Sequence, residues 1–293
     1  MVTFDTSTIR LGLPKGRMEQ GVFKLLRDAN IEVSLGSRAY RPKTVLHQVE
    51  IKLQKPQNII EMLSAGSRDI GFAGKDWAEE LQADLVELLD TELDPIKLVA
   101  AAPAEMARRL QRKGAVAKSL VVASEFERIT KEWITRRELD ASFVRSYGAT
   151  EVFPPEDADI VVDITQTGAT LEANELVVID ELLESSTRMF ASPRALENQE
   201  KRERIEGLVM ILRSVLDARQ RAFVTLNVDK ASLDGVLSIL PRMREPTVQT
   251  LSRDMGFAVS VAVPRASLAN LIPRIKSHGG TDIVVTAIAQ LIP

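Results

Sequence analysis

Short apolar runs alternate with amphipathic stretches through the first 100 residues of the chain. The apolar runs predict strands over residues 9–13, 45–51 and 70–73. Between them, apolar residues recur at helical spacing and predict helices over residues 18–30 and 56–65. Strands that alternate with helices in this way are typical of an α/β fold, with a mainly parallel sheet covered by helices on both faces.

A second unit of strands and helices follows. The pattern predicts strands over residues 97–101, 120–123 and 160–162, a helix from Pro103 to near Gly114, and a helix over residues 127–137. A strand over residues 187–191 returns to the first unit. Two α/β lobes with the chain crossing between them indicate a bilobal, periplasmic-binding-protein-like region with its ligand cleft at the carboxyl ends of strands. We predict lobe one over residues 1–98 plus 182–216 and lobe two over residues 99–181.

The pattern changes again beyond a long helix that Pro193 begins. Ala222, Val224, Leu226 and Val228 alternate with less apolar neighbours and predict a strand. The remaining elements are a helix over residues 233–240, strands over 247–251 and 257–263, a helix over 268–278 and a strand over 283–289. This βαββαβ order predicts a ferredoxin-like (ACT-like) domain over residues 218–293, and such domains often sense amino acids or form oligomers.

Composition excludes several classes of function. The net charge of -3 argues against a general nucleic-acid binder, which is usually basic. The chain has no cysteine and only two histidines, His47 and His278, so disulfides, zinc thiolates and multi-histidine metal sites are excluded. No segment approaches the ~20 apolar residues of a membrane-spanning helix, and the N-terminus lacks the apolar run of a signal peptide. We expect a cytoplasmic protein that binds neither nucleic acid nor membrane.

The segment from Asp159 to Leu171 carries the strongest chemical signal. The strand over residues 160–162 ends at Asp163, and a loop rich in hydroxyl groups follows with one glycine before a helical pattern begins. Backbone N–H groups at the start of a helix favour an anion, and Gly168 lets the backbone approach it closely. This arrangement suits a phosphorylated sugar, with Asp163 as acceptor for ribose hydroxyls. An ordinary strand-to-helix turn with threonine caps has the same local features.

Further motifs distinguish these alternatives, because together they resemble one family. Residues 10–17 read Arg-Leu-Gly-Leu-Pro-Lys-Gly-Arg, residues 69–76 read Asp-Ile-Gly-Phe-Ala-Gly-Lys-Asp, and residues 148–151 read Gly-Ala-Thr-Glu. The segment over residues 163–174 follows, and Glu-Pro-Thr at 245–247 and Val-Pro-Arg at 263–265 complete the set. They resemble the long form of ATP phosphoribosyltransferase, the first enzyme of histidine biosynthesis, which carries a C-terminal regulatory domain.

The resemblance implies the chemistry of the cleft. A ring nitrogen of the adenine of ATP attacks the anomeric carbon of phosphoribosyl pyrophosphate, and pyrophosphate leaves. Such catalysis depends on positioning and on stabilising the charge of the leaving group. Mg2+ is implied as cofactor, held mainly through the pyrophosphate rather than by a dedicated protein cage.

Both lobes contribute residues to the implied site. Lys15 and Arg17, on the turn with Gly16, would meet a polyphosphate, and Asp69, Gly74 and Lys75 would line the same cleft. Asp163 and Glu151 would hold ribose hydroxyls or water molecules on Mg2+. The ribose phosphate would be held by the loop: Thr165, Gln166, Thr167, Gly168, Ala169 and Thr170. Any one of these lysines or arginines alone would read as a surface cation, and Glu151 alone as a loop carboxylate.

The sequence departs from the family pattern at several positions. Gln166 stands where a small residue is usual, and Thr165 where an aliphatic residue is common; we expect tuning rather than loss of phosphate binding. The segment between Glu151 and Asp163 is one residue shorter than usual and contains Pro154 and Pro155. Residues 124–126, Ser-Glu-Phe, replace a usual Thr-x-Tyr-Pro turn.

For the C-terminal domain, the resemblance implies feedback inhibition by L-histidine. Asp229 would pair with the ammonium of histidine and Thr247 would hydrogen-bond it. Asp229 also suits the simpler role of a cap for the helix over residues 231–240. Asp282 falls where the family usually has a small residue. The resemblance further implies a homo-oligomer, a hexamer built from dimers.

Three other readings remain at the level of sequence. A bilobal binding protein without catalysis shares the fold class but has no use for the Thr-Gly-Ala-Thr loop. An inactive regulatory relative would not need Lys15, Asp163, Gly168 and Thr170 together. A different phosphoribosyltransferase usually carries two adjacent acidic residues before its loop, whereas here Val162 precedes Asp163.

Overall fold

The computed structural model describes residues 7–35, 40–110, 119–241 and 245–292, and the chain forms two compact units. Unit 1 comprises Met1–Lys24 and Ile31–Ile205, and unit 2 comprises Leu25–Asn30 and Glu206–Pro293. No helix within the described residues is long and apolar enough to cross a membrane.

Unit 1 is built on one sheet of eight strands in the order β4-β1-β5-β10-β6-β9-β7-β8. Their bounds are β1 Ile9–Pro14, β4 Val49–Gln54, β5 Ile70–Gly74, β6 Val86–Pro103, β7 Leu120–Ser124, β8 Ala141–Arg145, β9 Ile160–Thr165 and β10 Leu176–Ala191. In lobe one, β4, β1 and β5 are parallel and β10 runs antiparallel to β5. In lobe two, β8, β7 and β9 are parallel and β6 runs antiparallel to β9. Between β1 and β4 in the sequence, β2 (Val33–Ser34) and β3 (Lys43–Thr44) form a separate two-stranded antiparallel ribbon.

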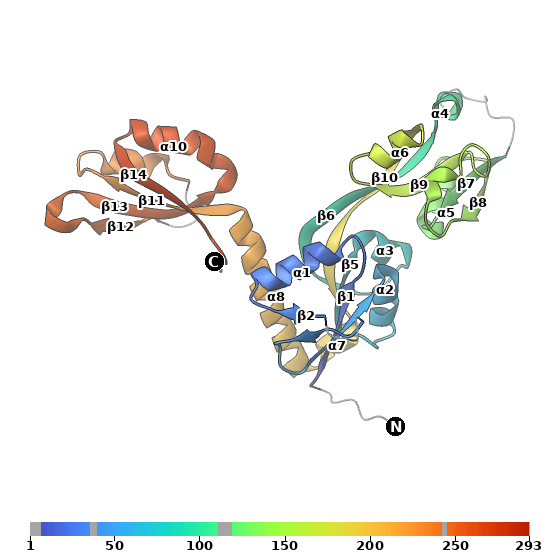
Figure 1. Ribbon diagram of the computed structural model, residues 1–293, viewed down its shortest axis with the longest axis horizontal. Coiled ribbons are helices and arrows are strands. Elements are labelled where there is room, and N and C mark those ends of the chain that lie inside the picture. The colour runs from blue at the N-terminus through green and yellow to red at the C-terminus, as the bar shows by residue number, and fades with distance from the viewer. Residues whose placement is uncertain (1–6, 36–39, 111–118, 242–244, 293) are drawn as a thin grey trace. The chain divides into compact units, whose positions relative to one another are not determined.

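Two long strands join the lobes. β6 has 18 residues and β10 has 16, and they pair antiparallel from Leu176 opposite Pro103 to Ala191 opposite Val86. Figure 1 shows both strands running from one lobe into the other. The register shifts repeatedly along this ladder, which bends and twists the pair between the lobes. The prediction of two α/β lobes with the chain crossing between them is confirmed.

The helices of unit 1 pack apolar faces on the sheet. Their bounds are α1 Glu19–Asp28, α2 Pro56–Ser64, α3 Lys75–Glu80, α4 Ala104–Leu110, α5 Glu127–Arg136, α6 Ala169–Ala173, α7 Pro193–Glu197 and α8 Gln199–Arg219, with α1 and α8 continuing into unit 2. α2 buries Ile59, Ile60 and Leu63, whose spacing follows the helical period. In lobe two, Trp133 of α5 is buried in the core, and its indole N–H donates to the carboxylate of Asp180 at 2.9 Å.

Unit 2 has the ferredoxin-like arrangement. Its elements are β11 Arg221–Val228, α9 Leu233–Ile239, β12 Thr247–Thr250, β13 Phe257–Pro264, α10 Leu268–Ser277 and β14 Gly280–Ala287. The strand order β12-β13-β11-β14 is antiparallel throughout. Alternate residues of β11 and β13 enter a core with α9 and α10, as their period of two predicts. The predicted fold class, including the βαββαβ domain, is confirmed.

Several predicted element limits are wrong, for identifiable reasons. The strands predicted over residues 97–101 and 187–191 are the carboxyl-terminal parts of β6 and β10, because Asp94-Pro95 and Ser185-Ser186 interrupt the apolar pattern before them and hide the longer strands. Pro103 ends β6 rather than opening a helix; α4 begins one residue later, and Gly114 lies outside the described residues. The helix from Pro193 is interrupted at Asn198, whose backbone is extended. The strand predicted over residues 45–51 is observed later, as β4.

A buried ion cluster holds the amino ends of β1 and β5 together. Asp69 is 2% exposed and accepts hydrogen bonds from Arg10 Nε at 3.0 Å, Arg10 Nη2 at 2.8 Å and Lys201 Nζ at 3.0 Å. Burial alone would raise the pKa of Asp69, but the hydrogen bonds from Arg10 and Lys201 outweigh it and hold the pKa below its usual value.

We expect Asp69→Asn to lower the free energy of unfolding by about 3 kcal/mol at neutral pH, because it leaves the buried ammonium of Lys201 without its carboxylate partner. Since the pKa of Asp69 is lowered in the folded state, the difference from the parent should shrink as the pH falls through the acidic range. Urea unfolding followed by circular dichroism measures both.

The matched control is Glu181→Gln, which breaks an exposed ion pair between Lys97 and Glu181. Exposed pairs contribute at most about 1 kcal/mol, so this variant should unfold like the parent. Equal stability of the two variants would show that the buried cluster does not hold lobe one together.

Candidate active site

A cavity of about 260 Å³ lies where the carboxyl ends of five strands meet. It is lined by residues that follow β1, β4, β5 and β7 and by two residues in the last part of β9: Lys15, Arg17, Met18, Lys55, Pro56, Gln57, Asp76, Trp77, Glu125, Phe126, Asp163 and Ile164. Parallel strands bring such residues to one edge of each lobe, and this is the usual place for a ligand in open α/β sheets. The cavity therefore unites side chains from both lobes.

The turn after β1 presents cations to this cavity. Gly16 has φ +82°, a conformation that suits glycine, and it turns the chain directly after the strand. The backbone N–H of Lys15 donates to the carbonyl of Gln54 at 2.9 Å, and its ammonium lies 3.8 Å from the ring centre of Tyr40. Arg17 donates through Nη1 to the carbonyl of Asp94 at 2.9 Å, which ties the turn to the crossing strand β6. Both cations are held at the mouth of the cleft.

The end of β5 is tightly packed. A Cβ at Gly74 would lie 2.0 Å from Oδ1 of Asp76, so only glycine fits there. Asp76 is buried and accepts a hydrogen bond from Ser185 Oγ at 2.5 Å, while its own backbone N–H donates to that hydroxyl at 3.0 Å. Burial raises the pKa of Asp76, although Ser185 opposes this. Lys75, between them, begins α3 and is partly buried.

Asp163 ends the apolar part of β9 and faces the cavity from lobe two. Its Oδ1 accepts the backbone N–H of Ile164 at 2.7 Å. Burial, together with the nearby carboxylates of Glu151 and Glu125, raises the pKa of Asp163 to about 6 against the opposing effect of that hydrogen bond. Glu151 lies in the 3-10 turn over Thr150–Val152, close enough for its charge to act on Asp163. A partly buried carboxyl beside two others is suited to a ligand that offers hydroxyls or positive charge.

The loop after Asp163 exposes polar groups before α6. Gly168 has φ +82° and caps α6. Its N–H donates to Thr165 Oγ1 at 2.9 Å, and the N–H of Ala169 donates to Thr167 Oγ1 at 3.4 Å. Gln166, Thr167, Ala169 and Thr170 are exposed. The backbone N–H groups of the loop thus donate to threonine hydroxyls, and an anion can replace these hydroxyls as the acceptor.

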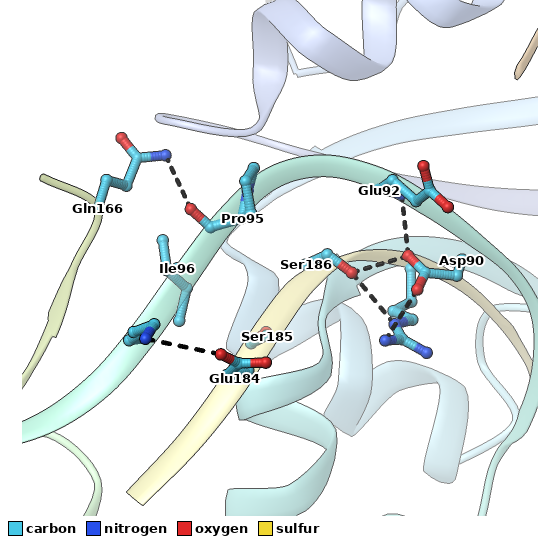
Figure 2. Close-up of a pocket in the computed structure, with 10 residues that line it drawn as sticks. Asp90, Glu92, Pro95, Ile96, Gln166, Glu184, Ser185 and Ser186 are labelled. Atoms are coloured by element: carbon cyan, nitrogen blue, oxygen red, sulfur yellow. Dashed lines mark hydrogen bonds and ion pairs between the residues drawn. The ribbon is translucent and has the colours of Figure 1, made fainter. Parts of the chain in front are cut away.

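A second, larger cavity of about 410 Å³ lies beside this loop, against the crossing strands. Figure 2 shows Gln166 reaching over it, with Nε2 donating to the carbonyl of Pro95 at 3.4 Å. Ser186 donates to Asp90 at 2.7 Å, and Arg188 pairs with Asp90 at 2.9 Å, so the polar groups on this wall already have partners. Gln166 therefore links the loop to β6 across the lobes.

The structure does not bring every predicted residue to the cleft. Asp69 precedes β5, whereas Gly74 ends it, so about 16 Å of strand separates Asp69 from the cavity.

The two residues predicted to bind histidine in unit 2 lie apart. Thr247 on β12 pairs with Ser260 on β13, and Ser260 pairs with Thr225 on β11, which is four residues before Asp229. Four residues of strand span about 13 Å, so one small ligand cannot touch the side chains of both Asp229 and Thr247 within one chain.

Several cavity residues were missed from the sequence. Lys55 directly follows β4, the same signal that singled out Lys15 after β1, but the predicted strand ended too early to reveal it. Gln57 Oε1 is buried and has no hydrogen-bond partner among the described residues. Trp77 and Phe126 stack with ring centres 4.6 Å apart and form an aromatic wall from both lobes. Only the tertiary structure places these aromatic residues together.

We expect Asp163→Asn to stabilise the folded chain above pH 6. The ordinary pKa of this carboxyl, 3.8, is raised to about 6 in the folded state, so ionisation opposes folding and the free energy of unfolding falls as the pH rises between these values. The gain at pH 8 should reach up to about 3 kcal/mol and vanish below pH 4. Urea unfolding across this pH range measures it, and equal stability of parent and variant at pH 8 would contradict a strained carboxylate.

Comparisons with known proteins cover nearly the whole chain. The family model described as ATP phosphoribosyltransferase matches residues 55–214, and the model described as HisG, C-terminal domain, matches residues 218–290. The ATP phosphoribosyltransferase of Chlorobium phaeobacteroides is 33% identical over 291 residues, 98% of each chain. That of Chlorobaculum parvum is 34% identical over 297 residues, 98% of this chain and 99% of the relative.

A solved structure agrees on the fold. A chain of the ATP phosphoribosyl transferase (HisG:HisZ) complex from Thermotoga maritima aligns with a TM-score of 0.62 and 24% identity, over 72% of this chain and 99% of that one. The family resemblance predicted from the motifs is confirmed. The chain belongs to the ATP phosphoribosyltransferase family of histidine biosynthesis, in the long form that carries a C-terminal domain.

Proposed function

We propose that the cleft transfers the phosphoribosyl group of phosphoribosyl pyrophosphate to the adenine ring of ATP and releases pyrophosphate, the first step of L-histidine biosynthesis. One observation carries the assignment of the site: cations from lobe one and Asp163 from lobe two line a single cavity. The substrates, a nucleotide and a sugar phosphate, are charged intracellular metabolites, so we place the reaction in the cytoplasm.

Lobe two would bind the sugar phosphate. Exposed N–H and hydroxyl groups from Thr165 to Thr170 would hold the ribose phosphate, replacing the present bonds to Thr165 and Thr167. Asp163 and Glu151 would accept hydrogen bonds from the ribose hydroxyls. Because Asp163 is partly buried, such hydroxyl donors would favour its ionised form and lower the pKa again on binding.

Lobe one would meet the charge that develops on pyrophosphate as the bond to the anomeric carbon breaks. Lys15, Arg17 and Lys55 converge from two strand ends, and Lys75 begins the neighbouring α3. The ring nitrogen of adenine supplies its own lone pair, so the proposal needs no nucleophilic side chain; fixed cations stabilise the departing charge instead. Asp69 holds β1 and β5 together and does not contact the substrate in this proposal. In this proposal, lobe one (residues 1–98 plus 182–216) binds the leaving pyrophosphate, lobe two (residues 99–181) binds the sugar phosphate, and residues 218–293 form the regulatory domain.

Mg2+ is proposed as the metal ion of the reaction. Among the described residues, no three carboxylates or histidines converge closely enough to bind a metal by themselves. Asp163, with Glu151 and Glu125 nearby, offers oxygen atoms of the type that Mg2+ prefers, so these residues fit an ion held largely through a bound pyrophosphate. When bound, Mg2+ would neutralise charge on the leaving pyrophosphate.

The transferase is tested by ultraviolet absorbance with ATP, phosphoribosyl pyrophosphate and Mg2+. The parent should show substrate-dependent absorbance growth. Lys15→Ala should reduce kcat/KM more than tenfold, because it removes a cation from the leaving-group side. Lys276→Ala, an exposed cation on α10 in unit 2, is the control and should leave the rate unchanged. A folded parent that binds both substrates without turnover would indicate an inactive regulatory relative.

We also propose that unit 2 senses L-histidine and that the chain assembles into a hexamer built from dimers. Asp229 is exposed at the end of β11 and can meet an ammonium group. Gly256 lies against its backbone, since a Cβ there would come within 2.5 Å of the Val228 carbonyl. Because Thr247 is too distant in the same chain, the proposal assigns Thr247 to a ligand only as a residue of a neighbouring copy.

For the sensor, we expect Asp229→Asn to raise the histidine concentration for half-inhibition at least tenfold, since the neutral amide cannot pair with the ammonium. Turnover without histidine should equal that of the parent. Asp234→Asn, on the first turn of α9, is the control and should keep normal inhibition. Unchanged inhibition in Asp229→Asn would remove Asp229 from the histidine site; it does not cap α9, whose N-cap is Ser232.

A further inference from the structure

The two lobes also meet away from the crossing strands, through α3 of lobe one and α5 of lobe two. Glu80 is the last residue of α3 and is 8% exposed. Its Oε1 accepts the backbone N–H of Arg128 at 2.9 Å, and its Oε2 accepts that of Ile129 at 3.0 Å. Both N–H groups belong to the first turn of α5.

This contact replaces a helix cap that α5 lacks in its own sequence. Phe126 occupies the N-cap position and has no polar side-chain atom to accept a hydrogen bond. The first N–H groups of a helix have no partner within the helix, and they favour a negative charge. Glu80 supplies that charge and both acceptors from the other lobe. Arg128 returns the contact, since Nε donates to the Glu80 carbonyl at 3.1 Å.

The cap fixes a chain of contacts that leads to Asp163. Phe126, directly before α5, stacks on Trp77 of α3. The N–H of Phe126 donates to Ser124 Oγ at 2.9 Å, and that hydroxyl donates to the carbonyl of Val162 at 2.6 Å. Asp163 is the next residue. The position of α5 relative to α3 thus bears on the carboxylate that lobe two presents to the cavity.

We propose that Glu80 is a positioning residue that latches the lobes: it caps α5 across the cleft, sets the closed separation of the lobes and keeps the aromatic wall and Asp163 in place. The latch itself stands on the contacts of α3 and α5; its effect on turnover rests on the proposed transferase. Because the two N–H groups are only partly buried and water can replace a carboxylate there, this contact can open without unfolding either lobe.

The test compares Glu80→Gln with the matched control Glu79→Gln. The side chain of Glu79 is exposed, and only its backbone carbonyl contacts Arg128. Acrylamide quenching of tryptophan fluorescence reports the latch, because Trp77 is in the aromatic wall while Trp133 is 1% exposed and stays shielded. Glu80→Gln keeps the side-chain shape but loses the charge and one of two acceptors.

In Glu80→Gln we expect quenching to rise at least twofold without ligand and to return to the parent value with phosphoribosyl pyrophosphate and Mg2+. The KM for ATP should rise about tenfold with little change in kcat, because saturating substrate restores the closed state. Glu79→Gln should match the parent in both.

Parent-like quenching and KM in Glu80→Gln would overturn the latch, and so would a lowered melting temperature with quenching that ligand does not reverse. If quenching rises in Glu80→Gln but the parent shows no transferase activity, the latch is supported and the proposed function is refuted.

Discussion

Antiparallel pairing of β6 with β10 is the constraint on which the cleft depends. Each lobe takes an edge of its sheet from this one ladder, with β10 beside β5 in lobe one and β6 beside β9 in lobe two. Backbone hydrogen bonds therefore fix which strand ends meet. The carboxyl ends of β1 and β5 and those of β7 and β9 border a common cavity because the ladder bends between them. Binding residues come from loops at these ends, while the ladder supplies the frame.

Two aspartates near the ends of strands show how the surroundings of a carboxylate decide whether it stabilises the fold or is available to bind a ligand. Asp69 is enclosed by Arg10 and Lys201, and its pKa is lowered. Asp163 has one backbone N–H as partner and two carboxylates as neighbours, and burial raises its pKa to about 6. The first carboxylate is satisfied and holds strands together. The second makes no ion pair among the described residues, which is the condition of a carboxylate that can bind a ligand.

The sequence was sufficient for features that depend on neighbouring residues. The turn after β1 and the loop after Asp163 carry their own glycine and threonine chemistry, so they could be placed from local pattern alone. Asp69 was misplaced because its motif was read as a unit, although a residue before a strand lies at the opposite end from one after it. Lys55, Trp77 and the cap by Glu80 depend on how strands and lobes pack, which no local pattern encodes. The long crossing strands were hidden because their middle is polar where it borders a cavity.

The two connections between the lobes differ in kind. A ladder of many backbone hydrogen bonds cannot open without unfolding, whereas one carboxylate at a helix start can exchange with water. Under the proposed function and the proposed latch, a movement of one lobe against the other would therefore break the Glu80 contact and leave the β6–β10 ladder paired. The ladder keeps the strand ends of the two lobes facing a common cavity, and the Glu80 contact decides how closely those ends approach.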